Sequence, residues 1–363
     1  FGLGKRVFYE TSEIDTVIMS STILSDDGSL KTRTFGRVEL PTHKCDHPGT
    51  NLWNPVQKWE GPGFFGIDGE YNNQVRADSH FDADPDLLSN LFLNRTDICP
   101  DVGIISTGTS VISISFDEWG SAENKLQHFE SEIKKWFWPA LSAQNKEIKI
   151  FLRIFDNHNI MRTVELGINE DSDTNWMPFV DCMQLESNAN EISNLGNLVE
   201  EPITWSIPPT IDQGKEFSHG EHEAEGFLKV LKSDAVNPTK CNHIALLRNK
   251  LCVMNYLTAP VPVDEDNYIY GVFLAGHAPE ILDDNTHNFL IQSEPPLHND
   301  WQYQHKIANF YKFSGTTNDK KAREALKLQK SIYTQITSKL ADLISIEAPI
   351  DRNNLDDLSS FFS

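Results

Sequence analysis

Alternating apolar and polar residues predict three strands in the first third of the chain. The segment Thr16–Leu24 (TVIMSSTIL) is rich in β-branched residues, and residues 32–40 (TRTFGRVEL) alternate in the same way. An Asp-Gly pair lies between these two segments, which is typical of a hairpin turn. Residues 107–116 (TGTSVISISF) predict the third strand, whereas residues 41–69 are expected to form a long loop and residues 84–92 a short helix.

The middle of the chain mixes helical and extended patterns. Residues 127–141 (QHFESEIKKWFWPAL) have helical periodicity as far as Trp138, and the proline that follows should disturb the helix there. Residues 147–154 and 163–166 are predicted to be strands that pair with each other. Residues 169–226 are polar and irregular, and we expect strands joined by long loops in this segment.

The last third carries the clearest patterns. Residues 243–257 predict two strands around a tight turn that contains Arg248 and Lys250, and residues 268–275 (YIYGVFLA) predict another strand. Residues 318–346 predict the longest helix, because apolar residues recur there at spacings of three, four or seven. This apolar stripe consists of Leu326, Ile332, Tyr333, Ile336, Leu340, Leu343 and Ile344.

Together these elements predict an α+β protein with two domains. We place the first domain at residues 1–125 and the second at residues 126–346, with a flexible tail at residues 347–363. With 39% apolar and 23% charged residues, the chain has the composition of an ordinary globular protein.

The net charge of −22 disfavours a general nucleic-acid grip, because it repels phosphate backbones at long range. The five cysteines form no CxxC pair and are odd in number, which is typical of free thiols in a reducing compartment. No run of about 20 apolar residues is present, so no membrane span is predicted and we expect a cytoplasmic protein.

The chain begins with the sequence FGLGK, in which a Gly-x-Gly turn precedes an amphipathic segment. Such a turn at the start of a helix leaves backbone N–H groups free to face an anion, and the helix dipole adds partial positive charge. Gly2, Leu3, Gly4 and Lys5 are therefore candidates for phosphate binding. The sequence is not a P-loop, because Arg6 stands where Ser or Thr would hold Mg²⁺, and it lacks the third glycine of a Rossmann turn.

The order of these elements resembles that of the GHKL superfamily of ATPases, which includes the ninety-kilodalton heat-shock chaperones, MutL-type mismatch repair proteins, gyrase B and the MORC proteins. In that family an FGxG turn closes the ATP lid, and a later Gly-Thr-x-Ile strand lies near the adenine. FGLG resembles the lid turn, and Gly108, Thr109 and Ile112 resemble the strand, with one extra residue before the isoleucine. Residues 1–117 carry the resemblance through motifs and residues 126–345 through domain order alone.

The resemblance implies an ATP-binding conformational switch. Residues 1–125 would be the C-terminal part of a two-layer ATP-binding sandwich, and residues 126–346 an α/β transducer that passes the nucleotide state to a partner. ATP and Mg²⁺ are the implied cofactors, with Thr109 near the adenine. Several family members extend an Arg or Lys from the transducer to the γ-phosphate, and Arg248 and Lys250 are the candidates here.

The resemblance also limits what this chain should do alone. The family's catalytic Glu, its metal-holding Asn and its adenine-reading Asp all precede the lid, so we expect them before Phe1, and the Mg²⁺ ligand outside this chain. The intact parent would be a slow ATP hydrolase that binds a protein partner or forms a homodimer. Some MORC-like bacterial proteins occur with anti-phage genes, which indicates defence or DNA maintenance as the process.

Two other classes of function stay open. The acidic surface and aromatic loops are also typical of a protein-binding scaffold without catalysis. A metal-dependent hydrolase could use His43, Cys45 and His47, which alternate in a loop, or His219 and His222, but neither group has the spacing of a known zinc motif.

Two further constellations have plainer interpretations. Cys241 and His243 would share one face of a strand, as a thiol and its base could, but no orienting acid accompanies them. The Trp136-Phe137-Trp138 run is expected to close a core at a helix end, with contact to a partner as the alternative.

Overall fold

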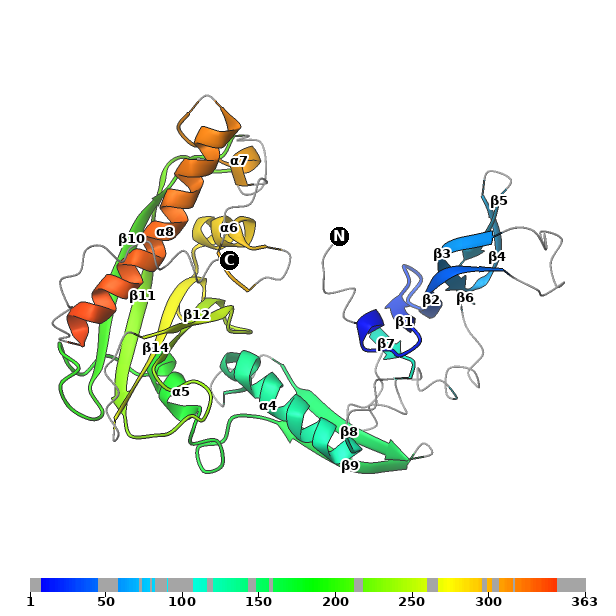
Figure 1. Cartoon of the computed structure of the whole chain (residues 1–363), viewed down its shortest axis with the longest axis horizontal. Coiled ribbons are helices and arrows are strands. Elements are labelled where there is room, and N and C mark those ends of the chain that lie inside the picture. Colours follow the sequence, from blue (N-terminus) through cyan, green and yellow to red (C-terminus); the bar gives the residue numbers. More distant parts are fainter. Residues whose placement is uncertain are drawn as a thin grey trace. The chain divides into compact units, whose positions relative to one another are not determined.

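The computed structural model describes residues 8–44, 58–71, 74–78, 80–81, 90, 107–115, 120–142, 148–156, 159–211, 218–259, 267–295, 299–301, 307–315 and 317–344. The chain divides into two compact units (Figure 1). The first comprises Phe1–Lys125 with Ile154–Arg162, and the second comprises Leu126–Arg153 with Thr163–Ser363. Within the predicted helix at residues 84–92 the structure describes Asn90 alone, which is helical, and the predicted tail lies outside the described residues.

The first unit is built on a five-stranded antiparallel sheet. Strands β1 (Thr16–Leu24) and β2 (Leu30–Lys44) form the predicted hairpin, and β7 (Gly108–Ser113) pairs with the other edge of β1. Strands β3 (Lys58–Phe65) and β6 (His80–Phe81) both pair with β2. The hairpin and the third strand are thus confirmed.

The prediction of a long loop at residues 41–69 is wrong. Strand β2 continues to Lys44, β3 follows, and β4 (Ile67–Tyr71) pairs with β5 (Gln74–Asp78) in a separate hairpin. Strand β3 contains two glycines and a proline and has no alternating pattern of apolar residues, so the sequence did not indicate a strand there. Backbone pairing with β2 stabilises it instead.

Helix α4 (Ala122–Leu141) continues one turn further than predicted, through Pro139. A proline inside a helix has no N–H for the carbonyl four residues earlier, which here belongs to Lys135. The Tyr256 hydroxyl donates to that carbonyl at 2.5 Å and accepts a bond from Trp138 Nε1 at 3.0 Å. This replacement bond explains why the helix tolerates the proline.

The end of α4 closes a core, as predicted. Trp138 is fully buried and stacks near Phe179, while Trp136 packs against Tyr256. Phe137 is 36% exposed on the outer side of the helix. Strands β8 (Ile150–Asp156) and β9 (Asn159–Leu166) follow α4 and pair as a two-stranded sheet.

The second unit contains a five-stranded sheet in the order β10-β11-β14-β12-β13. All neighbours are antiparallel except β12 and β14, which run parallel. The strands are β10 (Leu198–Ile207), β11 (His222–Ser233), β12 (His243–Asn249), β13 (Asn255–Thr258) and β14 (Tyr268–His277). The two strands predicted from residues 243–257 correspond to β12 and β13.

Helices cover both faces of this sheet (Figure 1). Ile244 and Leu246 of β12 belong to a core shared with α6 (Asp284–Ser293), α7 (Ile307–Phe310) and α8 (Asn318–Leu343). The alternate residues Ala245 and Leu247 belong to a second core, shared with α4 and α5 (Met177–Gln184). Burial on both faces explains why the central strands are apolar throughout.

Three described helices of this unit, α5, α6 and the short α7, were not predicted from the sequence. Helix α5 lies in the segment that was expected to contain strands and loops. It is short, and Phe179, Val180 and Met183 are buried on several of its sides, so its sequence shows no amphipathic pattern. Asp283 is the N-cap of helix α6, and its carboxylate accepts hydrogen bonds from the backbone N–H groups of Asn285 and Thr286.

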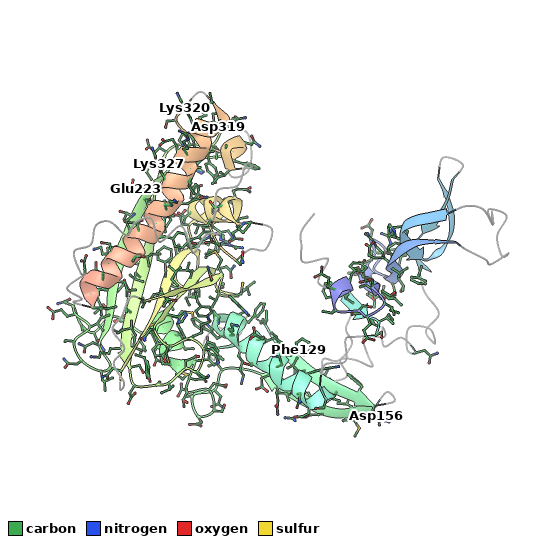
Figure 2. The ribbon with its side chains drawn as sticks, viewed as in Figure 1. Phe129, Asp156, Glu223, Asp319, Lys320 and Lys327 are labelled. Carbon is green, nitrogen blue, oxygen red and sulfur yellow. The ribbon has the colours of Figure 1, made fainter. Side chains whose placement is uncertain are left out.

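Helix α8 confirms the longest predicted helix and most of its apolar stripe. Ile332, Ile336 and Leu340 are buried, but Leu326 is 40% exposed, and Ala325 takes the buried position beside it. The stripe is thus rotated by one residue at its start. Asp319, Lys320 and Lys327 occupy the polar side of the helix (Figure 2).

The protein therefore has an α+β fold with antiparallel and mixed sheets. Among the helices of the described residues, none is long and apolar enough to cross a membrane.

Candidate functional site

Residues 8–10 form the described part of the helix that follows the FGLG sequence, and hydrogen bonds connect it to β7. The Ser113 hydroxyl donates to the Phe8 carbonyl at 2.8 Å, and the Thr11 hydroxyl lies 3.1 Å from the same carbonyl and from Ser113 Oγ. This helical turn is therefore anchored to the end of β7.

The four predicted phosphate-binding residues, Gly2, Leu3, Gly4 and Lys5, lie outside the described residues. Their predicted role stays a prediction.

Thr109 is exposed at the start of β7, and its hydroxyl lies 2.7 Å from Ser21 Oγ on β1. Strand alternation places Thr109, Val111 and Ser113 on one face, while Ser110 is buried on the other. The Ser113 side chain is hydrogen-bonded to the Phe8 carbonyl, so the helical turn lies on the face of the sheet that also carries Thr109. The four residues from Thr109 to Ser113 span about 13 Å along the strand.

The positively charged side chain of Arg37 lies on the same face of the sheet, close to the helical turn. Val17 of β1 pairs with Ser113 on one side and with Arg37 on the other, so the three side chains share this face. The Arg37 guanidinium lies 5.6 Å from the ring centroid of Tyr9 and 5.8 Å from that of Phe64. It also forms an ion pair with Glu39, which partly neutralises its charge.

Arg248 occupies a different setting from the one predicted. It lies within β12 rather than at a turn tip, and its Nη2 donates to Glu294 Oε2 at 2.9 Å while its Nε donates to Glu294 Oε1. Glu294 is 1% exposed and the Arg248 side chain is 17% exposed, so this ion pair is largely shielded from solvent. Breaking a buried pair by removing one partner costs about 3–5 kcal/mol, so Arg248 could reach a phosphate only after this pair opens.

Lys250 lies in the turn after β12 and is exposed. The turn is held by Asn249, whose side-chain oxygen accepts the backbone N–H groups of Leu251 and Cys252. The prediction of a tight turn at this point is confirmed for Lys250, and its predicted contact with phosphate stays a prediction.

A stacked histidine pair adjoins Arg248. The rings of His277 and His287 lie 3.8 Å apart and 6° from parallel. His277 Nε2 is 2.7 Å from Asp284 Oδ1, and His287 Nδ1 is 3.1 Å from the Arg248 carbonyl. Burial, together with the charges of His277 and Arg248, lowers the pKa of His287 below its usual value.

The histidines considered for metal binding are arranged differently from a metal site. His222 Nε2 is 2.8 Å from Asp283 Oδ2, where the imidazole supports the cap of α6, and His219 Nδ1 is 2.6 Å from the Gly220 carbonyl. His43 lies in β2, whereas Cys45 and His47 fall outside the described part. Within the described ranges, no group of three or more His, Cys, Asp or Glu residues is placed to hold a metal ion.

Cys241 and His243 are not arranged as a thiol and its base. The Cys241 thiol donates to the Asn237 carbonyl at 2.9 Å, and His243 Nδ1 is 2.6 Å from the Cys241 backbone carbonyl rather than from its sulfur. Both groups are thus engaged with the backbone of the loop that precedes β12.

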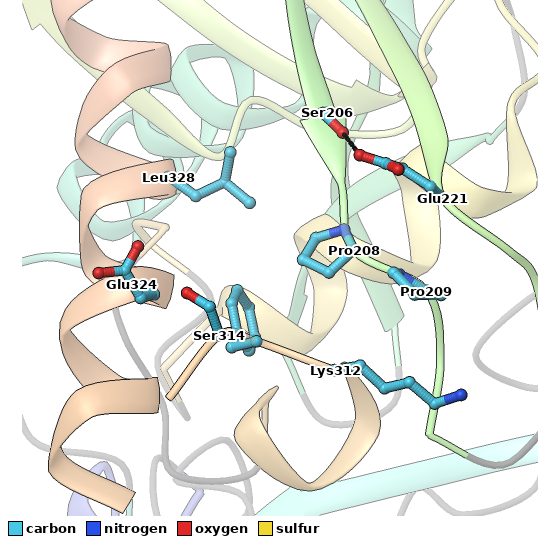
Figure 3. A pocket seen from close by; sticks show the side chains of 9 residues that line it. Ser206, Pro208, Pro209, Glu221, Lys312, Ser314, Glu324 and Leu328 are labelled. Atoms are coloured by element: carbon cyan, nitrogen blue, oxygen red, sulfur yellow. Dashed lines mark hydrogen bonds between the residues drawn. The ribbon is translucent and has the colours of Figure 1, made fainter. Parts of the chain in front are cut away.

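A shallow hollow of about 320 Å³ lies in the second unit between α8 and the segment that follows β10 (Figure 3). Glu324 and Leu328 line one side, and Pro208 and Pro209 line another. Its acids have protein partners, since Glu221 accepts from Ser206 at 3.0 Å and Glu324 from Lys327 at 2.8 Å. The hollow carries charges of both signs and specifies no ligand.

Sequence reasoning missed the groups around Arg248. Glu294 stands before a proline pair and His277 and His287 stand in unremarkable segments, so only the packing of α6 on β12 and β14 brings them together. The position of these residues in the fold is a signal that could have found them. They lie near the carboxyl ends of the parallel strands β12 and β14, where binding sites often occur in α/β sheets.

No protein-family model and no curated protein matches the sequence.

Proposed function

We propose that this chain is part of an ATP-binding conformational switch of the GHKL type. In this proposal the first unit supplies the C-terminal part of the nucleotide site. The second unit acts as a transducer that passes the nucleotide state to a protein partner or a second copy.

One observation carries the proposal: the helical turn after FGLG and Thr109 lie on the same face of one sheet. Gly4 precedes Phe8 by four positions, so the connecting chain can separate the two residues by at most about 14 Å. Thr109, proposed to lie near the adenine, is about 13 Å from Ser113 along the strand.

The proposed switch needs a contact that differs between two states, since a ligand with equal affinity for both states shifts nothing. The Arg248–Glu294 pair supports such a contact, because the guanidinium is held by one carboxylate and could exchange it for a phosphate. In the proposal, Lys250 remains the exposed cation that meets the phosphate first.

The test measures nucleotide protection of the intact protein that contains this chain. A non-hydrolysable ATP analogue with Mg²⁺ should raise the melting temperature, because a ligand that binds only the folded state stabilises it. Gly4→Glu should abolish the shift, since it places a negative charge against the phosphates. Thr109→Val, which removes only the hydroxyl, should weaken binding without preventing it.

Gly220→Glu is the matched control. Gly220 has open space around its Cβ position and lies in the second unit, so the same change of charge and size there should leave the shift intact. Absence of a shift in the unaltered protein would contradict the proposal and favour a scaffold without nucleotide. An equal loss in both glutamate variants would show that Gly4 acts through stability alone, which also contradicts it.

A further inference from the structure

Lys240 stands out among the partly buried cations of the second unit. Its ammonium lies 4.6 Å from the ring centroid of Tyr256, and it forms no ion pair with any carboxylate in the described part of the chain. Other partly or fully buried lysines do have such partners: Lys134 is 2.7 Å from Asp173, and Lys229 is 3.2 Å from Glu200. In a chain with 53 acidic and 31 basic residues, a half-buried lysine without a carboxylate is unexpected.

Two more basic side chains surround the same aromatic pair. The rings of Trp136 and Tyr256 lie 5.7 Å apart, and the Lys135 ammonium is 5.4 Å from the Trp136 centroid. The His243 ring lies 6.3 Å from the Tyr256 ring. Lys135, Lys240 and His243 therefore approach one aromatic surface from α4, from the loop before β12 and from β12 itself.

The electrostatics of this cluster favour binding of an anion. Burial and the neighbouring charge of Lys135 lower the pKa of Lys240, although Glu132 opposes the effect. Burial lowers the pKa of His243, and the charge of Lys240 lowers it further, against the bond to the Cys241 carbonyl. Glu132 is engaged with Lys135 at 3.1 Å, so it leaves the positive field at Lys240 incompletely neutralised.

We infer that Lys240, Lys135 and His243 form a binding site for a small phosphate-bearing ligand. An ammonium group binds phosphate as a point charge with up to three donors. The two ammonium groups can therefore donate to one phosphate group. His243, whose Nδ1 already donates to the Cys241 carbonyl, can donate from Nε2 once the bound anion favours its protonated form. The aromatic pair holds the lysines in place through cation–π contacts.

This site is separate from the nucleotide contact proposed above and does not depend on it. His243 begins β12 and Arg248 stands five residues later, so the two ends lie about 17 Å apart along the strand. A failure of the ATP test would leave this inference standing, since the two tests use different ligands and different variants.

The experiment titrates inorganic phosphate into the full chain with ¹³C-labelled lysine and follows the side-chain resonances by NMR. The Lys240 resonance is assigned from its loss in Lys240→Gln. We expect a saturable shift of the Lys240 resonance and a higher apparent pKa of Lys240 in phosphate, because a bound anion favours the charged amine. Lys135→Gln should weaken phosphate binding about tenfold or more, which corresponds to about 1.4 kcal/mol.

Two controls make the result specific. Acetate at matched ionic strength tests whether any anion suffices, and Lys312→Gln removes an exposed lysine that lines the hollow elsewhere in the same unit. Thermal shifts are not used, because phosphate stabilises folded proteins in general. The inference is overturned if phosphate gives no saturable shift, if acetate acts equally, or if Lys135→Gln binds as well as the unaltered chain.

Discussion

At the scale of single residues, the most constrained group is the stacked histidine pair beside Arg248. His287 stacks on the His277 ring and contacts the Arg248 carbonyl, and Asp284 Oδ1 is 2.7 Å from His277 Nε2. A second positive charge on this stack would be repelled by the first and by Arg248. The folded state therefore favours neutral His287, consistent with its lowered pKa.

This arrangement predicts a loss of stability in mild acid. A histidine with a lowered pKa binds its proton more weakly in the folded state than in the unfolded state. Its contribution is complete above the unfolded pKa of about 6.5, and it is lost as pH falls from there toward the folded pKa. The slope from one such group is at most about 1.4 kcal/mol per pH unit.

Urea unfolding between neutral pH and mild acid measures the effect. His287→Gln should flatten part of the decline, while His128→Gln, at an exposed position on α4, should follow the unaltered chain. An unchanged decline in His287→Gln would show that the stack does not control the response.

At the scale of elements, α4 depends on a side chain from a distant strand. Pro139 removes one helical hydrogen bond, and the Tyr256 hydroxyl of β13 takes its place at the Lys135 carbonyl while also accepting from Trp138. Burial keeps the pKa of Tyr256 far above its usual value, so the hydroxyl retains the proton that it donates. The last turn of α4 and the edge of the sheet are thus joined through one hydroxyl.

Tyr256→Phe should therefore destabilise the second unit by about 1–3 kcal/mol, because it leaves a carbonyl and an indole N–H without a partner. Tyr268→Phe is the matched control, since the Tyr268 hydroxyl has no hydrogen-bond partner among the residues that the structure describes. Denaturant unfolding compares the two variants. Equal stability of both would mean that the helix does not need the replacement bond.

At the scale of the whole molecule, the dominant property is the net charge of −22. Excess charge of one sign opposes compaction through self-repulsion. Three ion pairs among the described residues, Arg37–Glu39, Glu123–Arg162 and Glu324–Lys327, have both side chains exposed and contribute little each. Added salt should therefore weaken the repulsion between like charges more than it weakens these ion pairs.

We therefore expect the melting temperature to rise by a few degrees as sodium chloride is raised from about 0.01 M to 0.15 M, where the Debye length falls from about 30 Å to 8 Å. Differential scanning calorimetry checks this, and chloride avoids the general stabilisation that sulfate or phosphate would add. A melting temperature that falls with salt would indicate that specific ion pairs outweigh the repulsion.

The sequence by itself determined the elements whose stability is local. Strand β1, the hairpin with β2, β7, β14 and α8 follow from β-branched runs, turn residues and helical periodicity. It also determined the α+β class, because these patterns fix the kinds of element present. Thr109 was found at a strand start for the same reason.

The tertiary structure alone decided which residues meet. Arg248 and Glu294 are 46 positions apart, and Tyr256 lies 121 positions from the carbonyl that it satisfies. Helix α5 and strand β3 carry no clear periodicity, since one is buried on several sides and the other is held by backbone pairing. Local patterns record local preferences, whereas burial and pairing between distant segments depend on how the chain packs, so these contacts became visible only in the folded protein.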